Sequence, residues 1–307
     1  MSKTLLITGA SAGLGAAIAR HAAARGHRLL LTARRADALQ QVADSCRQAG
    51  AAEITTYPLD LADSAAVAAW LAALPPVDVL INNAGFGLFK EATACNDAEN
   101  SAMLRLNVLA AMQISAALVP PMQVRGGGQL IFVASQAGKI ATPKAAVYAA
   151  SKHALLGYAN ALRLELRGSG VTVTTVNPGP MATPFFNTAD PGGNYREKLG
   201  RFWLLDPERI AALTVAAIGK NVREINRPRL MEAAASTRSP RALATGSPRH
   251  SLTANSQTVT NPQAPAATMR SSTHNRRISM ATIRTALLTA ALLGTTAAIA
   301  APVKYDI

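Results

Sequence analysis

The first 233 residues are predicted to form a doubly wound α/β domain on a parallel sheet. Short runs that are apolar on both faces alternate with segments of helical length, which is typical of strands buried between two layers of helices. The chain has 307 residues, 49% of them hydrophobic, and is long enough to bury a sizeable core. Ligands of such folds bind beside the carboxyl ends of the strands, so functional residues are expected there.

The first part of the chain alternates four strands with three helices. The strand segments are short and apolar, and the helical segments are rich in alanine. Pro75 and Pro76 end the third helix, because proline cannot continue one. The expected strands are Thr4–Thr8, His27–Ala33, Glu53–Tyr57 and Val77–Ile81, and the expected helices are Leu14–Arg25, Asp37–Ala49 and Ser64–Leu74.

The alternation continues toward the C-terminus with a longer helix and further apolar runs. Crossovers between parallel strands of one sheet are expected to be right-handed. The expected helices are Ala98–Val119, Ala146–Arg167 and Ile210–Ile218, and the expected strands are Gln129–Ala134, Val171–Val176 and a short seventh strand at Glu224–Ile225.

The net charge of +14 raises the question of nucleic-acid binding. Eight Lys or Arg residues and a single acidic residue, Asp306, follow Ala233, so half of the net charge lies beyond the domain. Within the domain the basic residues are spread along the sequence, which is typical of a solvated surface. We expect no specific nucleic-acid partner.

The remaining composition indicates an ordinary reducing environment. Cys46 and Cys95 have no partner spacing, and we expect both to be free thiols. The five histidines form no pair with ligand spacing, so we expect no metal site. The N-terminus has no signal-peptide architecture, which predicts a cytoplasmic location.

Glycines are concentrated directly after the first strand. Thr8–Gly15, TGASAGLG, leads into a helix with the spacing G-x-x-x-G-x-G. Glycine permits a sharp turn and a close approach, and a helix N-terminus offers free N–H groups to a pyrophosphate. The alternative is a tight strand-to-helix turn, but the position in the first βαβ unit favours a dinucleotide site. The predicted cofactor contacts here are Gly9, Ser11, Ala12, Gly13, Leu14 and Gly15.

Arg34 follows the second strand, where NAD-preferring enzymes usually carry an acidic residue for the ribose 2′-hydroxyl. An arginine suits the 2′-phosphate of NADP, so the sequence predicts that NADP(H) is preferred over NAD(H). The alternative is that Arg34 and Arg35 are solvated residues at the start of a helix. Asp60 and Leu61, after the third strand, are predicted near the adenine, although Asp60 equally suits a helix cap.

Tyr148 and Lys152 lie four residues apart in a predicted helix and therefore share a face. A phenol has a pKa of about 10, and a nearby cation lowers it toward the range useful for proton transfer. The pair thus predicts a general acid/base. The alternative is an ordinary exposed pair, with Ser135 as an ordinary hydroxyl at a strand end.

Five motifs in this order resemble the short-chain dehydrogenase/reductase family. They are Thr8–Gly15, Asn82–Gly85 (NNAG), Ser135, Tyr148 with Lys152, and Pro178–Thr183 (PGPMAT). The resemblance covers about residues 3 to 230. It implies a Rossmann fold and hydride transfer between a nicotinamide cofactor and a carbonyl or secondary alcohol.

The family resemblance also implies a role for each matching residue. Ser135 would hydrogen-bond the substrate carbonyl, Tyr148 would be the general acid, and Lys152 would lower the tyrosine pKa and hold the nicotinamide ribose. Asn107, in the segment RLNV, matches an asparagine that supports a water-linked proton path. The further cofactor contacts that the resemblance implies are Asn83, Ala84, Gly85, Tyr148, Lys152, Pro178, Gly179 and Thr183.

Two classes of function fit these residues. One is an NADP(H)-dependent oxidoreductase, and the other is a non-catalytic NADP(H)-binding sensor or scaffold. The combination of Asn107, Ser135, Tyr148 and Lys152 favours the enzyme, because a binder needs no acid. We expect a small carbonyl or alcohol substrate and a homo-oligomer.

The segment Met181–Leu205 is expected to roof the substrate pocket. Its glycines and aromatic residues suit a closing lid over an apolar substrate, and the alternative is a surface loop with a small hydrophobic cluster. The aromatic residues concerned are Phe185, Phe186, Phe202 and Trp203.

The composition changes after residue 233. Residues 234–279 contain no acidic or aromatic residue and are predicted to be a disordered basic segment. Residues 280–307 resemble a secretory signal peptide with its own methionine, Met280. We expect a frameshift or read-through product. The alternative is a C-terminal membrane anchor, which is less favoured because Thr285–Ala301 is shorter than the roughly 20 residues of a span.

Overall fold

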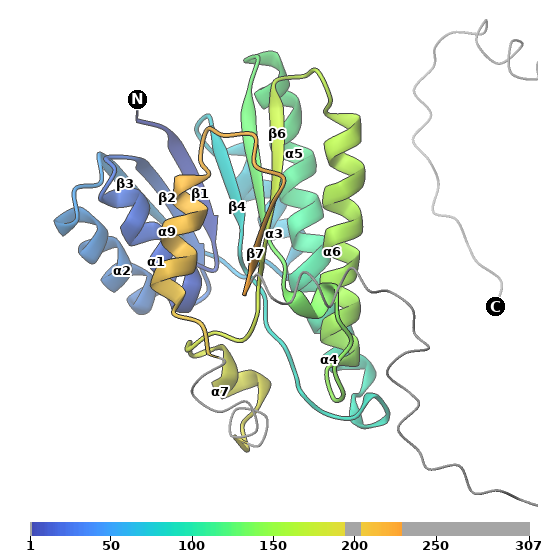
Figure 1. The fold of residues 1–307 in the computed structure, drawn as a ribbon. Coiled ribbons are helices and arrows are strands. Elements are labelled where there is room, and N and C mark those ends of the chain that lie inside the picture. The colour runs from blue at the N-terminus through green and yellow to red at the C-terminus, as the bar shows by residue number, and fades with distance from the viewer. Residues whose placement is uncertain (1, 194–203, 229–307) are drawn as a thin grey trace, which may run out of the picture. The chain divides into compact units, whose positions relative to one another are not determined.

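The computed structural model describes residues 2–193 and 204–228, and it confirms the doubly wound α/β fold (Figure 1). Seven parallel strands form one sheet in the order β3-β2-β1-β4-β5-β6-β7. The strands are β1 (Thr4–Thr8), β2 (Arg28–Ala33), β3 (Glu53–Pro58), β4 (Val79–Asn82), β5 (Gly128–Val133), β6 (Val171–Pro178) and β7 (Glu224–Arg227). The chain order reverses beside β1, between β1 and β4, which is where such folds bind ligands.

Helices cover both faces of this sheet. On one face lie α1, α2 and α9, and on the other lie α3, α5 and α6 (Figure 1). The helices are α1 (Gly13–Ala23), α2 (Ala36–Gln48), α3 (Ser64–Ala72), α4 (Asp97–Leu104), α5 (Ala110–Val124), α6 (Ala146–Glu165), α7 (Phe185–Ala189) and α9 (Pro207–Ala216). Short 3₁₀ turns occupy η1 (Ala92–Ala94) and η3 (Gln136–Gly138), and η2 (Arg105–Leu109) is a π-helical segment.

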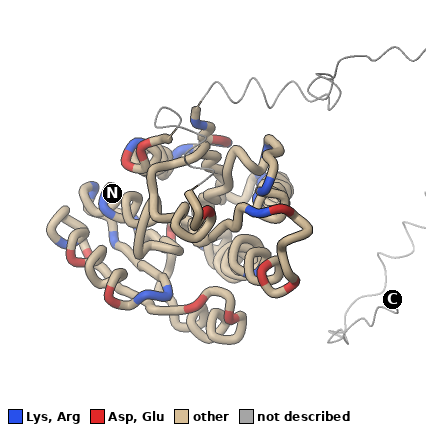
Figure 2. The backbone as a smooth tube through the Cα atoms, turned by 90° about the horizontal axis from the view of Figure 1, so that it is seen from below, with Lys and Arg blue, Asp and Glu red and all other residues tan. Residues whose placement is uncertain are grey.

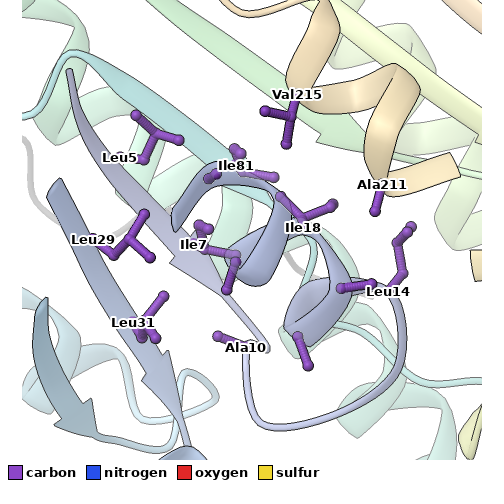
Figure 3. Close-up of a cluster of buried hydrophobic side chains, with 14 of the residues drawn as sticks. Leu5, Ile7, Ala10, Leu14, Ile18, Leu29, Leu31, Ile81, Ala211 and Val215 are labelled. Carbon is purple, nitrogen blue, oxygen red and sulfur yellow. The ribbon is translucent and has the colours of Figure 1, made fainter. Parts of the chain in front are cut away.

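Two hydrophobic cores explain why the strand segments are apolar throughout. Leu5 and Ile7 of β1 pack toward α1 and α9, while Leu6, between them, packs into the core on the opposite face. Figure 3 shows the first core, with Ile18 of α1 and Val215 of α9 facing the strands. Successive side chains of a strand point to opposite faces, so a sheet buried on both sides needs continuous apolar runs.

The predicted helix Ala98–Val119 differs from the observed one in two ways. It is interrupted by the π-helical segment η2, and its last part, α5, continues to Val124 through Pro120 and Pro121. Proline has no backbone N–H, so Pro120 and Pro121 cannot donate hydrogen bonds to the carbonyl oxygens of Ala116 and Ala117 one turn earlier. Both alanines are exposed, so water can hydrogen-bond to these carbonyl oxygens instead.

The helical run Asp97–Val124 is long and apolar enough to cross a membrane by length and composition alone. In this fold its buried side chains serve the domain core instead. Four side chains of this run are less than one-tenth exposed: Met103, Ile114, Leu118 and Met122. The last three belong to the core on the sheet face that α3, α5 and α6 cover. Basic and acidic residues are interspersed over the described domain (Figure 2), as their spread along the sequence leads one to expect.

The predicted domain boundaries reach past the described residues. The segments 234–279 and 280–307, predicted as a disordered arm and a signal-like segment, lie outside the described residues, as do Phe202 and Trp203 of the predicted lid.

Candidate active site

A cavity of about 710 Å³ lies at the carboxyl edge of the sheet. Its walls come from the loops after β1, β2, β3, β4, β5 and β6, from the start of α6, and from α7. These segments are distant in sequence but adjacent in the sheet, so the topology alone brings the five family-like motifs to one place.

The glycine loop after β1 is tightly joined to the loop after β4. The hydroxyl oxygen of Thr8 accepts hydrogen bonds from the backbone N–H groups of Asn83 (2.9 Å) and Ala84 (3.0 Å). The Asn83 amide donates to the carbonyl oxygens of Thr8 (2.9 Å) and Gly9 (3.2 Å). A Cβ at Gly15 would collide with the Gly9 carbonyl oxygen, so this glycine is required for packing beneath the loop.

The N-terminus of α1 is open toward the cavity. Its N-cap residue, Ala12, supplies no side-chain hydrogen bond, and the first turn contains no acidic residue. Gly13 has a φ of 55°, in the left-handed region that favours glycine. Ser11, Ala12, Gly13 and Leu14 all line the cavity. This uncapped helix end fits the pyrophosphate of a dinucleotide.

Two arginines lie where the second strand ends. Arg34 and Arg35 both line the cavity, and the Arg35 guanidinium lies 3.5 Å from the hydroxyl oxygen of Ser11. The sequence predicts a cofactor role for Arg34 alone, whereas both arginines line the cavity in the structure. Leu61 lines the cavity as well, whereas the carboxylate of Asp60 accepts a hydrogen bond from the N–H of Ala62 (3.0 Å). The α3 cap is Asp63 rather than Asp60.

Tyr148 and Lys152 share the buried face of α6, as their spacing predicts. Tyr148 is 8% exposed and Lys152 is 4% exposed, and both line the cavity. The Lys152 Nζ atom lies 5.8 Å from the centroid of the tyrosine ring and donates a hydrogen bond to the carbonyl oxygen of Val133 (3.0 Å). Burial lowers the pKa of Lys152 to about 8.

Ser135 lies at the end of β5 and begins the turn η3. Its hydroxyl oxygen accepts a hydrogen bond from the N–H of Ala137 (3.1 Å), and the hydroxyl donates weakly to the carbonyl oxygen of Pro178 (3.4 Å). Pro178, Gly179 and Thr183 line the same cavity. The serine therefore contacts the PGPMAT segment and lines the same cavity as Tyr148.

Asn107 lies behind the cavity wall, in the π-helical segment η2. Its amide donates to the Phe86 carbonyl oxygen (2.8 Å) and to the Ser151 hydroxyl oxygen (3.0 Å), and its oxygen accepts from the Phe86 N–H (2.9 Å). A Cβ at Gly85 would lie 2.8 Å from the Asn107 oxygen and 3.5 Å from Lys152 Nζ. The contacts of Asn107 thus join the NNAG loop to the helix that carries Tyr148 and Lys152.

Aromatic side chains pack around Tyr148 in the cavity wall. The ring centroid of Phe185 lies 5.6 Å from that of Tyr148, and the Phe89 centroid lies 5.9 Å away. Phe186 contacts both phenylalanines, at 5.9 Å and 6.0 Å. The N–H of Phe89 donates to the Ala189 carbonyl oxygen (2.7 Å), which fastens α7 to the loop after β4.

Most of the predicted site residues therefore converge on one cavity. Asn107, Gly15 and Asp60 do not line it, and the contact of Asp60 with an adenine stays a prediction. The lining residues that sequence reasoning did not assign include Arg35, Phe86, Phe89, Gln136, Ile140 and Thr142. Within residues 2–193 and 204–228, no group of three His, Cys, Asp or Glu side chains is placed to hold a metal ion.

The fold, the uncapped α1 N-terminus and the glycine loop together are those of a dinucleotide-binding protein of the Rossmann class. A family model described as short chain dehydrogenase matches residues 3–192. The chain belongs to this family of oxidoreductases.

Similar proteins agree with this assignment. The chain is 36% identical over 181 residues to a ketoacyl reductase, HetN, of a Nostoc species, and the match covers 58% of this chain and 63% of HetN, which is less than two-thirds of its length. A serine dehydrogenase structure complexed with NADP⁺ is 29% identical, with a TM-score of 0.65, and the match covers 72% of this chain and 94% of that one. A Burkholderia phymatum family member in complex with NAD is 25% identical, with a TM-score of 0.70, covering 76% and 92%. Both dinucleotides thus occur among the structural neighbours.

Proposed function

We propose that this protein is an NADP(H)-dependent oxidoreductase that interconverts a carbonyl and a secondary alcohol, with Tyr148 as the general acid/base. The observation that carries the proposal is the joint placement of Tyr148, Lys152 and Ser135 in the cavity that also contains the uncapped N-terminus of α1. NADP(H), when bound, supplies or accepts the hydride, and the residues of the chain position the reactants and transfer the proton.

Tyr148 would donate its phenolic proton to the carbonyl oxygen as that oxygen gains negative charge, and would take the proton back in the alcohol-oxidation direction. The Ser135 hydroxyl would give a second hydrogen bond to the same oxygen and stabilise the developing charge. In the structure this hydroxyl makes only a weak 3.4 Å bond to Pro178, so little is lost when it turns to a substrate.

Lys152 supports the proton transfer as a positive charge close to the phenol. With a pKa of about 8, its amine is mostly protonated near neutral pH, and its position 5.8 Å from the ring centroid favours the phenolate. The hydrogen bond to the Val133 carbonyl oxygen holds the Lys152 amine in place. Asn107 acts through its contacts with Phe86 and Ser151 and is a positioning residue.

The preference for NADP(H) rests on charge at the end of β2. Arg34 and Arg35 line the cavity, and none of its lining residues within 2–193 and 204–228 is acidic. A guanidinium suits a 2′-phosphate geometrically and electrostatically. The Ser11 hydroxyl, 3.5 Å from Arg35, offers a further hydrogen bond at the same position.

The substrate end of the cavity favours an uncharged, apolar carbonyl compound or alcohol. Phe89, Phe185, Phe186 and Ile140 supply its walls, and Thr142 adds a hydroxyl. An anionic group placed there would lose its hydration with no basic side chain among these walls to compensate it.

The test combines cofactor titration with turnover. NADPH should quench or enhance protein fluorescence at lower concentrations than NADH, and a panel of apolar ketones and aldehydes should reveal NADPH oxidation. A Tyr148→Phe variant should lose at least about 10²-fold in kcat while NADPH affinity changes little. The matched control is Tyr158→Phe, on the same helix but packed on Phe132.

The opposing hypothesis is a sensor or scaffold that binds NADP(H) without turnover. It predicts tight NADPH binding, no oxidation with any carbonyl, and equal behaviour of Tyr148→Phe and the parent chain. Unchanged turnover in Tyr148→Phe would instead remove the tyrosine from the mechanism.

A further inference from the structure

A second cavity, of about 360 Å³, lies at the edge of the sheet opposite the candidate active site. Lys3 lines it directly before β1, and Arg25 and His27 line it from the turn between α1 and β2. The other wall is the end of α9 and the turn that follows it. Figure 1 shows this end of β1, marked by the N-terminus, at the opposite end of the strands from α7. The wall residues from α9 and its turn are Val215, Ala216, Ile218 and Lys220.

In the described part of the chain, every polar side chain that lines this second cavity is basic. No acidic residue is among its lining residues, and in the described part of the chain Lys3, Arg25 and Lys220 take part in no ion pair. The carboxylate of Asp78, the residue before β4, accepts a hydrogen bond from the N–H of Thr4 (2.8 Å), which follows Lys3. Among the described residues, Lys3, Arg25 and Lys220 therefore have no carboxylate as an ion-pair partner.

His27 adds a directed hydrogen-bond donor to these charges. Its side chain is only 8% exposed, and its Nδ1 atom lies 3.2 Å from the backbone nitrogen of Lys3. A backbone N–H can only donate, so Nδ1 is the acceptor and the neutral ring carries its proton on Nε2. No described residue accepts a hydrogen bond from Nε2. Burial, with the charges of Arg25 and Lys3, lowers the pKa of His27.

Helix ends account for part of this arrangement. The C-termini of α1 and α9 both lie here, and the negative end of a helix dipole favours nearby cations. The caps of both helices are nevertheless made by backbone N–H groups, of Ala24 and Ala217. The basic side chains are thus not used as caps, and they stay available to a ligand.

We propose that this second cavity binds a phosphate-bearing small molecule. Lys3, Arg25 and Lys220 would neutralise the phosphate oxygens, and the Nε2–H group of His27 would donate a hydrogen bond to one of them. Val215 and Ile218 form an apolar wall that suits an attached organic group. The site is separate from the dinucleotide cavity and does not depend on the proposed function.

The test uses the ring protons of His27 in the full chain as a local reporter. Inorganic pyrophosphate and adenosine diphosphate are titrated separately and followed by NMR, with a His27→Gln variant to assign the signal. Either ligand should shift the His27 signal saturably and raise its apparent pKa, because an anion favours the charged ring. Adenosine diphosphate binding at least about tenfold more tightly would identify an organic phosphate, and equal binding would identify the phosphate groups alone.

A double variant, Arg25→Gln with Lys220→Gln, removes two exposed charges and should weaken binding about tenfold or more. The matched control is Arg209→Gln, at the opposite end of α9, which should bind as the parent chain does. The proposal is overturned by a His27 signal that neither ligand moves, or by a double variant that binds as tightly as the control. Pyrophosphate bound at the dinucleotide cavity leaves this reporter unchanged.

Discussion

The buried charge of Lys152, which supports the proposed role of Tyr148, should lower the free energy of unfolding. Its amine is buried, it has one hydrogen bond to the Val133 carbonyl oxygen, and its pKa falls from 10.5 to about 8. Replacing it by methionine, which has a similar shape and no charge, should therefore stabilise the protein near neutral pH while abolishing turnover.

The magnitude follows from the shift in pKa. A lowered lysine pKa means that the unfolded chain binds the proton more tightly, so the penalty is fully present below about pH 8 and disappears as the pH approaches 10.5. The shift corresponds to about 3 kcal/mol near pH 7, and about 2 kcal/mol of this should vanish by about pH 9.5. Loss of the Val133 hydrogen bond offsets about 1 kcal/mol in the variant.

Urea unfolding of the parent and Lys152→Met chains, without cofactor, measures this difference. The variant should be more stable by about 2 kcal/mol at about pH 7, and the two chains should become nearly equal by about pH 9.5. Lys144→Met is the control, since its side chain is 58% exposed and its pairing with Glu91 is long, at 3.7 Å. A Lys152→Met chain that is less stable by the same amount at both pH values would refute the reasoning.

Further predictions concern the chemistry, the dinucleotide and the stability of the fold. Ser135→Ala should lower kcat about 10²-fold or more with little change in NADPH affinity, and an unchanged kcat would contradict a bond to the reacting oxygen. Exchanging Arg34 and Arg35 for Asp and Ser should reverse the ratio of NADPH to NADH dissociation constants, and a constant ratio would place the 2′-phosphate elsewhere. Gly15→Ala should lower thermal stability, because its Cβ meets the Gly9 carbonyl oxygen. Gly157→Ala, in open space on α6, should instead add about 0.5–1 kcal/mol, as measured by unfolding.

The cofactor half of the site was predictable because its chemistry depends on local sequence. Tyr148 and Lys152 share a face because of helical periodicity, and the glycine loop joins a strand to a helix N-terminus, an arrangement that suits a pyrophosphate. Contacts across the sheet were not predictable in the same way. The Val133 carbonyl that holds Lys152 is 19 residues away and carries no side-chain signal. The π-helical segment around Asn107 likewise depends on the Phe86 loop that it binds.

Motif spacing does not reveal the residues at the substrate end of the candidate site. Phe89 follows the NNAG motif at no distinctive spacing, yet its ring contacts Tyr148 and its N–H fastens α7 through Ala189. A dinucleotide has constant chemistry, so the residues that hold it keep fixed residue types at fixed places in the fold. Substrates vary, and their pocket is built by side-chain packing among loops that the sheet topology brings together. Substitutions of Phe89, Phe185 and Phe186 should therefore change which substrates are accepted, while Tyr148 and Lys152 remain in place.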